Sequence, residues 1–366
     1  MEVKIKQCIH NIVGVFCLML GTIKVIRIIL LRYIPMMQSQ IYNNDRLVSL
    51  FLKILPGLIL IIISITLIAI TKKANNARLE KSQLISEESK TDKTLKVIEG
   101  STIGLLLIMH NGYNLIVEIC SQISSLINYK GASSDILSDS VLSEIYLDSL
   151  LTNIPIFVLY IAMIIIGVVL ISKTKKKYSI NTFTSYQPIK QRINKIVGLF
   201  FLIIGNISLI SPIASIFTAS LAVPKQFSSE DLFMWEAIIP KAIPSLIIIT
   251  ISLFLLVIAK KKSKLENEDC IAFKESISSK MVSVIKNSII GLLLIIYSGF
   301  FLLSYACNEI IMYISTQGST YIQIIETEKI MLLTNSPTLI LYIAALIVGV
   351  CLLIKTKKKY NMWKTY

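Results

Sequence analysis

The sequence has few charged residues and almost no histidine. Charged residues make up 16% of the 366-residue chain, whereas a soluble domain carries about 25%. The only two histidines, His10 and His110, exclude a histidine-rich metal site. The Walker loop, the H-E-x-x-H and G-x-S-x-G motifs and the CxxC spacing are also absent. We therefore predict no enzyme activity, no catalytic residue, no metal and no cofactor.

The cysteines do not indicate disulfides. Most of the six lie inside apolar runs, and none forms a CxxC pair. Free cysteine behaves as a small buried hydrophobe, and we predict no disulfide.

Long apolar runs are abundant instead. Hydrophobic residues make up 54% of the chain, and a helix needs about 20 consecutive apolar residues to cross a bilayer. Eight segments satisfy this requirement: 8–31, 50–71, 97–120, 150–172, 194–217, 237–259, 282–306 and 331–354. A helix satisfies its own backbone hydrogen bonds in lipid. We predict an all-α, polytopic integral membrane protein with eight transmembrane helices.

The net charge of +15 is concentrated after every second apolar segment. The lysine clusters are Lys72-Lys73, 173–177, 260–264 and 355–359. Cytoplasmic loops of membrane proteins carry such an excess of lysine and arginine. This distribution predicts a plasma-membrane protein with both termini cytoplasmic. It favours contact of the lysine clusters with anionic lipid head groups over any binding of nucleic acid.

An internal repeat organises the chain. Residues 150–178 (LLTNIPIFVLYIAMIIIGVVLISKTKKKY) align without a gap to residues 332–360 (LLTNSPTLILYIAALIVGVCLLIKTKKKY), with about two thirds of the positions identical. A fixed period indicates duplication. We predict two tandem four-helix halves, 1–183 and 184–366, related by a pseudo-two-fold axis along the membrane normal.

Glycines and prolines divide each half into two helical hairpins, predicted at 1–72 and 95–178 in the first half and at 192–262 and 281–360 in the second. The first helix of each hairpin carries a pair of glycines, and the second begins near a proline. The pairs are Gly14 and Gly21, Gly104 and Gly112, Gly198 and Gly205, Gly291 and Gly299, and the prolines are Pro56, Pro155, Pro244 and Pro337. Small residues let membrane helices approach closely, so we assign these glycines mainly to packing. A short apolar stripe in 136–150 favours either a helix on the outer surface or an extension of the next spanning helix.

Polar residues concentrate in the third apolar segment. His110, Asn114 and Glu118 lie four residues apart and share one helical stripe, which Asn111 borders. Polar side chains at membrane depth usually face the protein interior or a water-filled cavity.

The repeat predicts partners for this stripe. Arg27 lies 13 residues after Gly14, and Glu118 lies 14 after Gly104, so the two should be at one depth and form an ion pair. Lys24 and Asn114 both lie 10 residues after their glycines and should share one depth, with one or the other adjacent to the ion pair. The cluster of Lys24, Arg27, His110, Asn111, Asn114 and Glu118 has two interpretations, a structural contact or a substrate or ion pathway.

Two function classes follow. Tandem duplication and a polar cluster in the membrane favour transport or channel activity for a small solute or lipid. The alternative is a non-catalytic membrane partner, such as an immunity protein against a membrane-active peptide or an accessory subunit. The abundance of isoleucine, lysine and asparagine is compatible with a low-GC bacterium.

Overall fold

The structure of the chain is a computed structural model. It describes residues 2–30, 44–79, 90–132, 139–177, 183–222, 231–265, 279–316 and 321–360. These residues form the helices α1 (Glu2–Ile28), α3 (Asn44–Leu79), α4 (Lys90–Ala132), α5 (Asp139–Lys177), α6 (Phe183–Ala222), α7 (Asp231–Leu265), α8 (Ser279–Thr316) and α9 (Tyr321–Tyr360). Each helix contains a segment long and apolar enough to cross a membrane. Within the described residues, this confirms the predicted all-α, multi-pass membrane protein.

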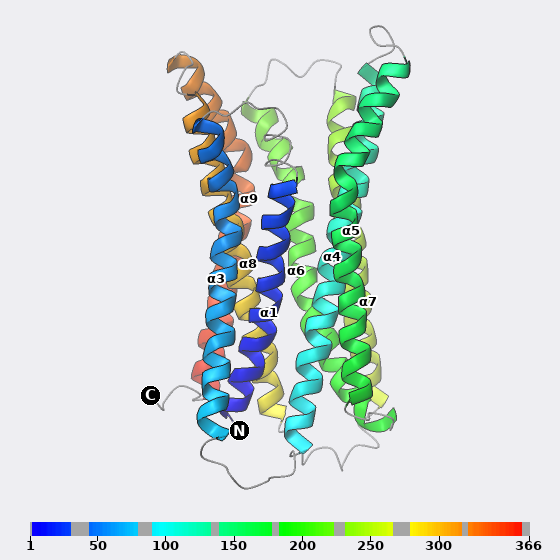
Figure 1. The fold of residues 1–366 in the computed structure, drawn as a ribbon, viewed down its shortest axis with the longest axis vertical. Coiled ribbons are helices and arrows are strands. Elements are labelled where there is room, and N and C mark those ends of the chain that lie inside the picture. Colours follow the sequence, from blue (N-terminus) through cyan, green and yellow to red (C-terminus); the bar gives the residue numbers. More distant parts are fainter. Residues whose placement is uncertain are drawn as a thin grey trace.

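The helices run side by side along the long axis of the molecule (Figure 1). The start of α1 and the end of α9 lie at one end of the bundle, together with the lysine-rich ends of α3, α5, α7 and α9 (Figure 1). The molecule therefore has one strongly basic end, here called the basic end. The other is called the distal end.

Several helices are longer than the apolar segments that predict them. Helix α5 continues without a break from Asp139, so from that residue on the 136–150 stripe is an extension of the spanning helix. Pro56, Pro155 and Pro337 lie inside α3, α5 and α9, and not near the helix starts as the sequence pattern indicated. The helices extend past the prolines because neighbouring helices in a membrane bundle compensate for the lost backbone hydrogen bond.

Four helices form an inner ring. Helix α1 contacts α4, α4 contacts α6, α6 contacts α8, and α8 contacts α1. Almost all of the largest fully buried side chains come from this ring, namely Ile12, Phe16, Leu106, Leu107, Ile196, Phe200, Phe201, Ile289, Leu293 and Leu294. The core of the protein therefore lies between α1, α4, α6 and α8.

The other four helices pack on the outside of the ring. The most extensive contacts pair α1 with α3, α4 with α5, α6 with α7, and α8 with α9. Three outer helices also pack on a second inner helix: α7 on α4, α9 on α6, and α3 on α8. Among the described residues, α5 makes no comparable contact with α1. The outer helices expose large apolar side chains, including Phe51, Ile62, Val158, Phe254 and Ile340, as surfaces in lipid do.

Glycines allow the close approach within these pairs. A Cβ atom on Gly21 would lie 2.7 Å from the carbonyl oxygen of Gly57, and one on Gly104 would lie 2.6 Å from that of Gly167. Gly291 faces Gly349 in the same way. Gly112, however, has nothing within 4 Å of the position its Cβ would take, so the packing role predicted for the glycines does not extend to every one.

Candidate functional site

The ion pair predicted from the repeat is present between α1 and α4. Nη2 of Arg27 lies 2.6 Å from Oε2 of Glu118. The Glu118 side chain is 9% exposed and the Arg27 side chain 36%. The carboxylate is therefore buried, whereas the Arg27 side chain lies partly at the surface of the bundle.

A third helix contributes to this contact. Nη1 of Arg27 donates a hydrogen bond to the hydroxyl oxygen of Tyr160 on α5, at 3.2 Å. Tyr160 is almost fully buried. Within the described residues, α1 and α5 lack the extensive contact that the other adjacent inner and outer helices make, and the Arg27 side chain bridges the two. The sequence analysis missed Tyr160, although Tyr342 occupies the same position five residues after the repeat proline.

The amide and histidine side chains of the α4 cluster bond within their own helix. The Nδ2 of Asn114 and the Nε2 of His110 are 2.8 Å apart. The Nδ2 of Asn111 donates to the Leu107 carbonyl oxygen at 2.8 Å. Asn111 is fully buried, and its Oδ1 atom has no hydrogen-bond partner among the described residues. An unsatisfied buried acceptor is costly, which makes Asn111 the least satisfied member of the cluster.

Helix α1 also meets α4 through His110. The His110 ring packs edge-on against Phe16, with ring centroids 5.8 Å apart and an interplanar angle of 86°. The repeat-related pair, Phe200 and Tyr297, has the same centroid distance and angle. Phe16 and Phe200 contact each other at 6.1 Å. Equivalent residues of the two halves therefore meet at the centre of the inner ring, which is closed by aromatic rings.

A second polar contact between α1 and α4 lies nearer the basic end. Nδ2 of Asn11 donates to Oε1 of Glu99 at 3.0 Å. The sequence analysis missed both residues. The repeat offsets could have found them, since Asn11 precedes Gly14 by three residues and Glu99 precedes Gly104 by five.

Lys24 faces a different helix from Arg27. Its ammonium group lies 6.0 Å from the centroid of the Phe300 ring on α8, while Asn114 bonds to His110. Lys24 precedes Arg27 by three residues, which rotates it about 60° around the helix axis. That rotation directs Lys24 toward α8 and Arg27 toward α4.

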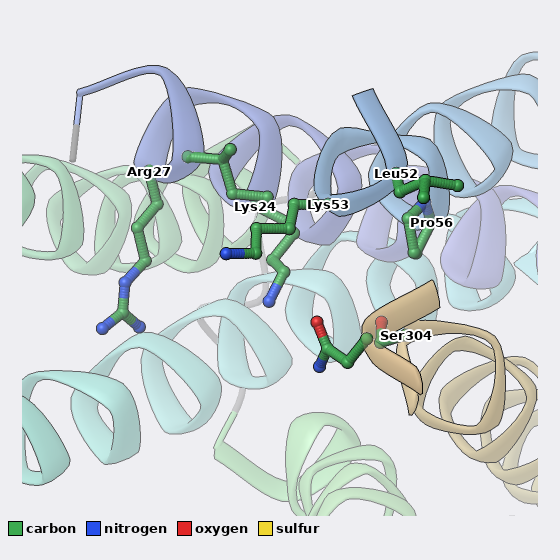
Figure 2. A pocket seen from close by; sticks show the side chains of 8 residues that line it. Lys24, Arg27, Leu52, Lys53, Pro56 and Ser304 are labelled. Atoms are coloured by element: carbon green, nitrogen blue, oxygen red, sulfur yellow. The ribbon is translucent and has the colours of Figure 1, made fainter. Parts of the chain in front are cut away.

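Lys24 instead lines a cavity of about 250 Å³ between α1, α3 and α8 (Figure 2). The lining residues are Lys24, Arg27, Ile28, Leu52, Lys53, Pro56, Ser304 and Asn308. Figure 2 shows the amino groups of Lys24 and Lys53 directed away from their helices into the same space, with Ser304 on the facing helix.

A further cavity, of about 310 Å³, lies between α1, α8 and α9 toward the basic end. Lys6, His10 and Lys357 are its basic lining residues. The described residues contain no group of three histidine, cysteine or acidic side chains placed to hold a metal ion. No protein-family model, curated protein or solved structure matches this chain.

Proposed function

We propose that the protein is a multi-pass transporter or channel for a small solute or lipid, with no enzymatic activity. The observation that carries this proposal is the polar contact surface between α1 and α4, here called the α1–α4 seam. Asn11–Glu99 lies toward the basic end of this seam, His110 lies at its centre against Phe16, and Arg27–Glu118 lies toward the distal end. Polar groups along one helix pair at membrane depth are typical of substrate and ion pathways.

The contact between α6 and α8 is the repeat-related counterpart of the α1–α4 seam. The difference between the two contacts supports the same interpretation. Its equivalents of Arg27 and Glu118 are Ser211 and Tyr305, and its equivalent of His110 is Tyr297. Ser211 bonds to Thr338 of α9, whose contact with α6 is extensive. If Arg27 and Glu118 served only to hold the bundle together, the uncharged version would serve equally well. These two charges have no charged equivalents in the second half, and this favours a role beyond packing.

The arrangement we propose is four hairpins in two tandem halves, with both termini in the cytoplasm and the protein in the plasma membrane. The near-identical Phe16–His110 and Phe200–Tyr297 pairs support a pseudo-two-fold relation between the halves. The lysine-rich helix ends gathered at the basic end support a cytoplasmic basic end.

Purified protein in liposomes tests the proposed function. Two fluxes are measured: ion current across the bilayer, and bleaching of a fluorescent phospholipid as it moves between leaflets. We expect wild type to exceed protein-free liposomes in at least one of them, and Glu118→Gln to change that rate. Asn206→Ala is the control, because this exposed amide bonds to its own helix at the Leu202 carbonyl. Rates equal to those of protein-free liposomes in both assays would contradict the proposal.

One observation favours the second candidate, a non-catalytic membrane partner such as an immunity protein or an accessory subunit. The centre of the ring is filled by Phe16, Phe200 and Phe201, all almost fully buried, as in a bundle that conducts nothing. A transporter in a closed state has the same feature. The flux measurement separates the two, because a partner protein would move neither ions nor lipid.

A further inference from the structure

The cavity between α1, α3 and α8, here called the distal cavity, is rich in positive charge. Lys24, Arg27 and Lys53 line it, and its lining includes no acidic residue. Glu118, across on α4, pairs with Arg27. For Lys24, the neighbour identified among the described residues is the face of the Phe300 ring.

The charges of the distal cavity do not follow the distribution of lysine in the rest of the chain. The lysine clusters lie at the basic end, whereas Lys24 and Arg27 lie near the opposite end of α1. Positive residues gather on the cytoplasmic side of membrane proteins, so that rule does not account for cations at both ends. Like charges held close together in a partly dry space repel each other. An anion in the cavity would remove this repulsion.

The cavity also offers neutral donors. Ser304 on α8 lines it, and the Oγ atom of Ser304 is buried without a hydrogen-bond partner among the described residues. Asn308 lies one helical turn further along α8 and contributes an amide. The ammonium group of Lys24, this hydroxyl and this amide together match an oxyanion that accepts several hydrogen bonds at once.

We infer that the distal cavity binds an oxyanion of the phosphate type, either a free phosphate or the phosphate of a lipid head group. Lys24 supplies the main charge contact, and Ser304 and Asn308 donate to the remaining oxygens. The cavity, of about 250 Å³, has room for inorganic phosphate, and its apolar wall at Ile28, Leu52 and Pro56 suits the glycerol end of a lipid. The inference rests on the proposed function in one respect: it names the anion as the class of substrate that is moved.

The test measures binding without flux. Full-length protein is placed in phosphatidylcholine nanodiscs, and its melting temperature is recorded in three settings: alone, with inorganic phosphate, and with part of the lipid replaced by phosphatidylglycerol. A ligand that binds only the folded state raises the melting temperature. A rise with inorganic phosphate identifies a free anion, and a rise with phosphatidylglycerol alone identifies a lipid head group.

Three variants assign the effect to the distal cavity. Lys24→Gln removes the charge and should weaken the apparent affinity about tenfold or more, the size of one charge-assisted hydrogen bond. Lys24→Arg should retain most of the binding. Lys357→Gln is the matched control, because it removes one charge from the other cavity along the same two helices, α1 and α8. It should leave the response to inorganic phosphate unchanged. For phosphatidylglycerol, whose head groups the basic-end lysines should also contact, the comparison of Lys24→Gln with Lys24→Arg assigns the effect.

The outcomes are decisive in both directions. No rise in melting temperature with either anion, the same rise in Lys24→Gln as in wild type, or equal loss in Lys357→Gln would overturn the inference. If Lys24→Gln does not fold, Ser304→Ala decides, since an unchanged affinity there also overturns it. A protein that binds the anion but shows no flux would contradict the proposed function and leave the anion site intact. Flux without anion binding would do the reverse.

Discussion

The Arg27–Glu118 pair joins the inner helices α1 and α4. Substitutions at these two residues test whether the α1–α4 seam depends on the pair. Removing either partner leaves the other charge without its counter-ion. In a fully buried site such a loss amounts to about 3–5 kcal/mol. Here we expect about 1–3 kcal/mol, because the Arg27 side chain is 36% exposed and therefore screened by water. Arg27→Gln and Glu118→Gln should each lower the melting temperature of the purified protein.

The double variant distinguishes a pair from two independent residues. Arg27→Gln combined with Glu118→Gln leaves no unpaired charge, so its melting temperature should recover part of the loss. Losses that simply add would mean that the two side chains act separately. Tyr160→Phe is a useful companion, since it removes only the hydroxyl that accepts from Arg27 and should cost about 1 kcal/mol.

A contact between two residues could be predicted from the sequence where the depth of the two side chains along their helices alone decided it. Equal offsets from the repeat glycines predict the depth of a side chain, and Arg27 and Glu118 do meet. The direction of a side chain depends on the rotation of its helix, which the offsets do not give. The offsets place Lys24 and Asn114 at one depth, but they do not show that Lys24 faces α8. The distal cavity was likewise not predicted. Three helices line it, and the repeat does not show which helices are neighbours in the bundle.

At the scale of helix pairs, the glycines set how closely the backbones approach. Gly104→Ala would bring a methyl group within 2.6 Å of the Gly167 carbonyl oxygen, so the α4 and α5 backbones must separate. We expect a loss of about 1–3 kcal/mol, as for other overpacked sites. The melting temperature of the purified protein and its yield as a single species measure this loss.

The same helix supplies the control. Gly112, eight residues further along α4, has nothing within 4 Å of its Cβ position. Gly112→Ala should be neutral, or stabilise by up to about 1 kcal/mol because alanine favours the helix. If both substitutions lower the melting temperature equally, the close α4–α5 contact is not the cause.

The extent of the helices was harder to predict than their number. Long apolar runs identify eight spanning helices because lipid leaves the backbone no other way to satisfy its hydrogen bonds. The runs do not mark helix ends, since polar residues extend a helix once the spanning part has formed. Asp139 and the polar residues after it therefore belong to α5, and Pro155 lies well inside it.

For the whole molecule, the inner ring is not equally well packed at every position. Helices α4, α6 and α8 each receive an outer helix from the neighbouring hairpin. Helix α1 receives no such close contact from α5 within the described residues, and the Arg27 side chain spans that position to Tyr160. One contact of the ring is thus looser than the others and is bridged by a charged side chain, as we would expect if it were the site of the proposed transport. The hydropathy pattern of the sequence does not reveal which contact of the ring is loose, because that depends on which helices lie next to each other in the bundle.

The orientation of the molecule in the membrane is the last prediction. All six native cysteines are replaced by alanine, and single cysteines are introduced at Ser134 or Lys176. Lys176 is an exposed residue at the basic end of α5, and Ser134 lies between α4 and α5, outside the described residues. With a cytoplasmic basic end, an impermeable maleimide added to intact cells should label Ser134→Cys and not Lys176→Cys. Permeabilised cells should label both, which shows that each thiol can react. Labelling of Lys176→Cys alone in intact cells would reverse the orientation, and with it move the distal cavity, and the anion it is inferred to bind, from the outer to the cytoplasmic side of the membrane.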